Sequence, residues 1–177
     1  MKKILAFSGS NYSKSINQQL VTIASSYVKK VSVEVISLMD YSAVMYGMDE
    51  EQANGFPQKM VELKEKMNSA DGFIVSSPEH NGSMPAVLKN SLDWVSRLEG
   101  KIFNDKPVVF LATSPGARGG ASVLAHIVGI MPYAGAQIIG SHAVGSFHEK
   151  VVDNDLIGAD KEKIQALVQE LEAEILA

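Results

Sequence analysis

The sequence predicts one α/β domain over residues 1–177, in which a five-stranded parallel sheet carries helices on both faces. Two observations predict this fold. Short apolar runs alternate along the chain with segments whose apolar residues recur at helical spacing. The chain also has 177 residues, of which 46% are hydrophobic, so it can bury a sizeable core without an interdomain linker or an internal repeat.

The first half of the chain supplies three of the predicted strands. The apolar run Ile4–Phe7 indicates a buried strand, the alternation from Val31 toward Leu38 indicates a second, and Gly72–Ser76 indicates a third. Tyr41–Gly55 has no clear period and predicts a loop. Two helices connect these strands, and their apolar faces are formed by Ile16, Leu20, Ile23, Ala24 and Tyr27 in one and Phe56, Met60, Leu63 and Met67 in the other.

The second half supplies the remaining elements. A helix begins at Pro85, because proline suits the first turn, and the fourth strand is Pro107–Ala112. Ala121–Met131 predicts a helix that is apolar nearly all round, and Ala136–Ile139 predicts the fifth strand. The last helix shows its apolar face at Ile164, Leu167, Val168, Leu171 and Ile175.

Alternation of strands and helices favours a three-layer αβα sandwich with the flavodoxin-like strand order 2-1-3-4-5. In such folds a ligand binds beyond the carboxyl ends of the strands, near the point between strands 1 and 3 where the order reverses. The loops after strands 1, 3 and 4 are therefore the candidate site.

The composition excludes several other functions. The net charge of −4, without a basic run, argues against a nucleic-acid surface. The absence of cysteine excludes disulfides, thiolate nucleophiles and Cys-ligated metals, and it is what we expect of a cytoplasmic protein. The longest apolar region, Val123–Ile139, is interrupted by polar residues and proline, so a membrane span of about 20 residues is not expected.

The loop after strand 1 reads GSNYSKSIN, Gly9–Asn17, and carries an unusual number of hydrogen-bonding side chains. It lacks the glycine spacing of both the Walker loop and the dinucleotide fingerprint. A hydroxyl-rich turn at a helix N-terminus can bind an anion such as phosphate. The alternative is that Ser13 or Ser15 only caps the helix.

The loops after strands 3 and 4 carry turn-forming residues. Asn81-Gly82 predicts a tight turn, and Glu79 beside His80 is either an acid/base pair or a solvated pair. The sequence TSPGARGG, Thr113–Gly120, has more glycine than a simple turn needs, so it is either a flexible loop or a backbone surface that approaches a flat ligand.

These three loops resemble the motifs of the NAD(P)H-dependent FMN reductases of the flavodoxin-like superfamily, which include chromate, quinone and azo reductases. The pattern GSxRxxSxN is similar to Gly9–Asn17. The pattern PEYNGSxPxxLKNxxDW is similar to Pro78–Trp94, and SPGxxGG to Ser114–Gly120. The second motif is the most specific of the three.

The resemblance implies an FMN enzyme that takes hydride from NADPH or NADH and reduces a small acceptor such as a quinone, an azo compound, chromate or free flavin. It also implies a homodimer or homotetramer, and it requires no metal and no catalytic side chain. The implied FMN-binding residues are Ser10, Tyr12, Ser15, Ile16, Asn17, Pro78, Glu79, His80, Asn81, Gly82, Ser114, Gly116 and Gly119.

Two positions depart from the family pattern. Tyr12 replaces an arginine that would offer a charge-assisted contact to phosphate, for which Lys14 is a candidate substitute. His80 replaces a tyrosine, which puts a titratable ring into the flavin loop. Two other functions stay open from the sequence: a flavodoxin-type electron carrier and a non-enzymatic nucleotide-binding module.

Overall fold

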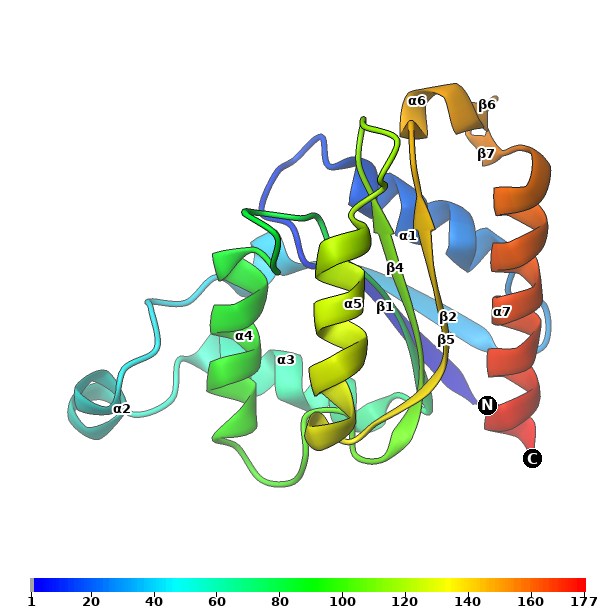
Figure 1. The fold of residues 1–177 in the computed structure, drawn as a ribbon. Coiled ribbons are helices and arrows are strands. Elements are labelled where there is room, and N and C mark those ends of the chain that lie inside the picture. The colour runs from blue at the N-terminus through cyan, green and yellow to red at the C-terminus, as the bar shows by residue number, and fades with distance from the viewer. Residues whose placement is uncertain (1) are drawn as a thin grey trace.

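A parallel five-stranded sheet with helices on both faces forms the body of the protein, for which a computed structural model describes residues 2–177 (Figure 1). The strand order is β2-β1-β3-β4-β5, which confirms the predicted order. The strands of this sheet are β1 (Lys3–Ser8), β2 (Ser32–Ser37), β3 (Gly72–Ser76), β4 (Lys106–Thr113) and β5 (Ala136–Val144).

Helices cover the two faces of the sheet unequally. Helices α1 (Ile16–Ser26) and α7 (Gly158–Leu176) cover one face, and α3 (Gln58–Ser69), α4 (Ala86–Ser96) and α5 (Ala121–Ile130) cover the other. The central strands are buried on both sides, which explains their continuous apolar runs. Short elements complete the chain: η1 (Leu38–Tyr41), α2 (Met48–Asn54), η2 (Met131–Ala134), α6 (Phe147–Lys150), and the hairpin of β6 (Val151–Val152) and β7 (Asp155–Leu156).

The predicted loop Tyr41–Gly55 is wrong in part, because it contains the helix α2 and the last residue of η1. Helix α2 has no buried residue and lies away from the sheet beyond α4 (Figure 1). A helix without a buried face has no apolar periodicity, so the sequence pattern could not show it.

Strand β5 extends beyond the predicted Ala136–Ile139, ending at Val144. Residues 140–143 are half-buried because β5 is an edge strand of the sheet, and the polar residues there interrupt the apolar run. This extension moves the next turn toward the edge of the sheet where the strands end.

Helix α5 is apolar by sequence but not enclosed by this chain. Val123, Leu124 and Ile127 are buried, whereas Ala125 and His126 are exposed. No helix within residues 2–177 is both long and apolar enough to span a membrane.

Candidate functional site

The loop between β1 and α1 supplies the N-cap of α1, and two backbone N–H groups in the first turn of this helix make no hydrogen bond within residues 2–177. Ser15 is the N-cap of α1, and its hydroxyl oxygen accepts from the Gln18 N–H at 3.3 Å. In the part of the chain that the structure describes, the N–H groups of Ile16 and Asn17 have no protein acceptor. The capping interpretation is therefore correct for Ser15, and the first turn still presents donors to an anion.

The Asn17 amide joins three elements rather than facing the solvent. Its Oδ1 accepts from the Ser76 hydroxyl at 2.7 Å and the Thr113 N–H at 3.0 Å, and its Nδ2 donates to the Thr113 carbonyl at 3.0 Å. The residue is 2% exposed. Because these contacts use most of the amide, Asn17 positions the loop by holding α1 to the ends of β3 and β4.

The loop after β3 is a tight two-residue hairpin turn. His80 and Ser83 exchange backbone hydrogen bonds of 2.9 and 3.1 Å, and both Asn81 and Gly82 have positive φ. Positive φ at both central positions is the geometry that Asn-Gly favours. A Cβ atom at Gly82 would meet nothing within 4 Å, so this exposed tip leaves room for a ligand beside it.

Glu79 holds the start of helix α5. Its Oε2 accepts from the backbone N–H groups of Ser122 and Val123, both at 3.0 Å. A carboxylate at this position satisfies two unpaired donors and matches the positive end of the helix. These bonds give Glu79 a structural role at the start of α5 that does not involve His80, which disfavours the acid/base interpretation of the two residues.

The loop after β4 presents one glycine to solvent and buries another. Gly116 is exposed, and a Cβ there would reach only the Ser114 hydroxyl at 3.9 Å. Gly119 is buried at φ 61°, where a Cβ would lie 2.7 Å from the backbone N of Gly145. Gly119 is therefore required for close packing of this loop against the end of β5.

These loops meet around one cleft of about 450 Å³ at the carboxyl ends of the strands. It brings together nine of the thirteen predicted residues, whereas Asn81, Gly82, Gly116 and Gly119 lie outside its wall. Its lining consists of Ser10, Tyr12, Lys14, Ser15, Ile16, Asn17, Pro78, Glu79, His80, Thr113, Ser114, Pro115 and His148.

Four lining residues were not among the predicted site residues: Lys14, Thr113, Pro115 and His148. Pro115 and Thr113 flank the predicted Ser114, and Lys14 belongs to the first loop. His148 was missed because the fifth strand was predicted to end at Ile139, which placed the following turn away from the cleft. A search of the segment after every strand would have found it.

A 2-1-3-4-5 parallel sheet with a cleft at the reversal of strand order defines a flavodoxin-like nucleotide-binding protein. The chain belongs to the NADPH-dependent FMN reductase family, whose sequence model matches residues 2–150. The family suggested by the three loop motifs is thereby confirmed, and with it FMN and NAD(P)H as the cofactors of this class.

Sequence relatives carry names of the same kind. A quinone reductase of Escherichia coli K12 is 34% identical over 113 residues, covering 63% of this chain and 60% of that protein. The chain thus matches less than two thirds of the length of that relative. A 2-hydroxy-1,4-benzoquinone reductase of a Burkholderia species is 35% identical over 133 residues, covering 74% of this chain and 70% of that protein.

A solved structure shows the same fold. The flavoenzyme NAD(P)H:(acceptor) oxidoreductase FerB of Paracoccus denitrificans superposes with a TM-score of 0.79, covering 99% of this chain and 98% of that one at 22% identity.

The donors around the cleft fit a phosphate ester. The first loop offers the two unused N–H groups at the start of α1, the Ser10 hydroxyl and the Lys14 ammonium group. The one carboxylate in the lining, Glu79, accepts hydrogen bonds from two backbone N–H groups at the N-terminus of α5. Within residues 2–177 no three His, Cys, Asp or Glu side chains group as metal ligands would.

Proposed function

We propose that this protein is an FMN-dependent oxidoreductase that takes hydride from NADPH or NADH and reduces a small acceptor. The observation that carries the proposal is the cleft itself, where a phosphate-binding loop, a hairpin turn and a glycine-containing loop meet at the reversal of strand order. Family membership supports the choice of FMN over other nucleotides. FMN supplies the acceptance of hydride and its onward transfer as electrons.

The chain's own residues hold and orient the cofactor in this proposal. The start of α1, with Ser10, Ser15 and Lys14, binds the phosphate group. The turn Glu79–Gly82 and residues Ser114–Gly116 border the ring system and leave one side open to the second substrate. Asn17, Glu79 and Gly119 keep the three loops at fixed positions relative to one another. The carboxylate and imidazole groups are not needed as proton acceptors, because hydride transfer to a flavin requires none.

A quinone is the acceptor class we favour, because the relatives in Escherichia coli and Burkholderia are named as quinone reductases. Azo compounds, chromate and free flavin stay as further candidates. Any flat acceptor that reaches the open side of the cleft would compete with the quinone for binding there.

The test begins with the purified protein and two flavins. We expect quenching of flavin fluorescence with tighter binding of FMN than of FAD, because the first loop lacks the dinucleotide fingerprint. NADPH or NADH added without oxygen should then bleach the bound flavin, and a quinone should restore its colour. Binding of FMN without bleaching by either nucleotide would favour an electron carrier. Absence of flavin binding would favour the nucleotide-binding module.

We further propose a homodimer or homotetramer in the cytoplasm. Large apolar side chains that are exposed in this chain support the assembly, namely Val44, Met45, Met48, Phe56 and Tyr133. Light scattering on the eluted protein measures the mass directly, and a mass of 19.1 kDa at micromolar concentration would contradict the assembly.

A further inference from the structure

His148 lies in the cleft beside the loop that we assign to phosphate. It lines the same cleft as Ser10, Lys14 and Ser15. The segment after it continues along the same loop, because Val151 and Asn154 line a neighbouring hollow of about 290 Å³ with Lys14 and Ser15. His148 is therefore on the phosphate side of the cleft.

The backbone around His148 is held firmly. The Ser146 N–H donates to the Gly116 carbonyl at 3.0 Å, and the Phe147 N–H donates to the Ser114 carbonyl at 3.2 Å. The Phe147 side chain is 1% exposed in the core. These contacts fix the backbone beside an exposed imidazole, so the ring can reach a ligand without a large loss of conformational freedom.

Over the described part of the chain, the positive groups of the cleft form no ion pair with a carboxylate. Across residues 2–177, neither Lys14 nor His148 takes part in an ion pair. Lys150, two residues on, lies 3.8 Å from Asp160, and Asp160 also contacts His142. The titratable and charged groups that share the cleft lining or the turn with His148 are Tyr12, Lys14, Glu79, His80, Glu149 and Lys150.

We propose that His148, when protonated, acts with Lys14 as the counter-charge of the FMN phosphate, so that this protein binds FMN more tightly below neutral pH than above it. The inference rests on the proposed function. It also accounts for Tyr12 at the position where the family pattern has arginine: one permanent and one pH-dependent cation replace a permanent one. A phosphate monoester is mostly a dianion above about pH 7, so it would favour the protonated imidazole.

The test measures FMN affinity by fluorescence quenching, without any turnover. The proteins are the wild type, His148→Gln, His148→Lys and Lys29→Gln, the last removing an exposed ammonium group outside the cleft wall. Each is titrated with FMN and with riboflavin, which lacks the phosphate, at about pH 6 and about pH 8.5, on either side of the usual histidine pKa. Comparing variants at one pH cancels the ionisation of the phosphate itself.

We expect His148→Gln to bind FMN about tenfold more weakly than the wild type at the lower pH and equally well at the higher pH. His148→Lys should retain tight FMN binding at both pH values. Riboflavin should not distinguish the four proteins, and Lys29→Gln should behave as the wild type does.

An equal affinity ratio at both pH values, or the same ratio for riboflavin, would overturn the role of His148 while leaving the FMN-binding function in place. Failure of the wild type to bind FMN at either pH would instead overturn the proposed function, and this inference with it.

Discussion

Asn17 shows how a residue of a binding motif can act through the fold. Its amide contacts Ser76 and both backbone groups of Thr113, so it holds the ends of β3 and β4 at fixed distances from α1. The sequence placed Asn17 in the phosphate loop, and it does line the cleft. Its hydrogen bonds, however, go mainly to the protein, which only the folded chain reveals.

We expect Asn17→Ala to lower the free energy of unfolding of the apo-protein by about 2–4 kcal/mol, because it leaves buried partners without hydrogen bonds. Urea denaturation measures this loss. Gln19→Ala, an exposed position on the same helix, is the control and should change the stability by less than about 0.5 kcal/mol. Equal midpoints for the two variants would show that the three hydrogen bonds add nothing.

His80 is expected to adjust the site without transferring a proton. Its backbone closes the hairpin turn, its side chain is exposed, and Glu79 beside it is occupied at the start of α5. We therefore expect His80→Tyr to reduce the flavin within about tenfold of the wild-type rate, since general acid–base catalysis would be worth about 10²–10⁴-fold. Anaerobic stopped-flow with saturating FMN measures this rate. A loss of the larger size with FMN fully bound would make His80 a catalytic residue.

At the scale of elements, α2 is attached to the fold without a buried face of its own. It has no buried residue, and the neighbouring chain is held by the Asn90 amide and the Trp94 indole, which bond to backbone groups of Ala43, Val44 and Tyr46. Within α2 itself, Glu51 accepts two bonds from Arg97, at 2.9 and 3.2 Å. The Arg97 guanidinium also lowers the pKa of the Glu51 carboxyl.

We expect Arg97→Gln to raise hydrogen exchange of the α2 amides a few-fold while the melting temperature stays nearly unchanged, because an exposed ion pair contributes little to global stability. Exchange measured by mass spectrometry resolves the helix. Lys59→Gln breaks a comparable exposed pair with Glu62 on α3 and should leave α2 unaffected. Unchanged exchange of α2 in Arg97→Gln would mean that the helix is held by its flanking segments alone.

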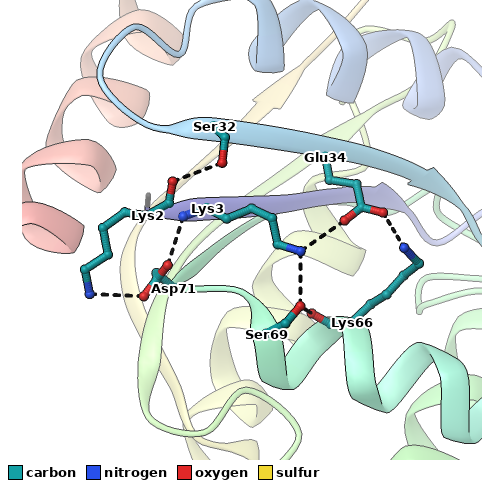
Figure 2. Close-up of polar contacts among 7 residues, drawn as sticks. All are labelled: Lys2, Lys3, Ser32, Glu34, Lys66, Ser69 and Asp71. Atoms are coloured by element: carbon teal, nitrogen blue, oxygen red, sulfur yellow. Dashed lines mark hydrogen bonds and ion pairs between the residues drawn. The ribbon is translucent and has the colours of Figure 1, made fainter.

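At the scale of the whole molecule, a group of ion pairs lies near the amino ends of β1, β2 and β3, at the end of the sheet opposite the cleft. Figure 2 shows Glu34 between Lys3 and Lys66, and Asp71 between the Lys2 ammonium group and the Lys3 N–H. The hydrogen bond from Lys66, followed by that from Lys3, holds the pKa of Glu34 below its ordinary value of 4.5. Burial alone would raise the pKa of Asp71. The hydrogen bonds from the Lys3 N–H and from Lys2 outweigh burial, so the pKa of Asp71 is lowered.

These shifts predict a loss of stability in acid. A carboxyl whose pKa is lower in the folded state stabilises the protein above its unfolded pKa, and this contribution disappears as the pH falls through the folded pKa. Glu34→Gln should therefore cost about 0.2–1 kcal/mol at neutral pH, the range for a partly exposed pair, and this cost should disappear as the pH falls through the folded pKa of Glu34. Thermal melts from neutral to acidic pH measure this cost. The control is Glu65→Gln, which removes an exposed carboxylate of α3. A difference between Glu34→Gln and the wild type that persists in acid would contradict the linkage.

The sequence by itself determined the sheet, the family and the end of the sheet where we propose that the ligand binds. Buried strands show apolar runs and amphipathic helices show helical periodicity, so both can be recognised in the sequence. Each of the three loop motifs directly follows a predicted strand, so the motifs can be placed at the same end of the sheet. Only the tertiary structure decided what could not be read from local patterns. Helix α2 has no buried face, β5 is a half-buried edge strand, and His148 and Asn17 obtain their places from contacts with residues far along the chain. Periodicity reports burial along one element, whereas such contacts depend on how the elements meet.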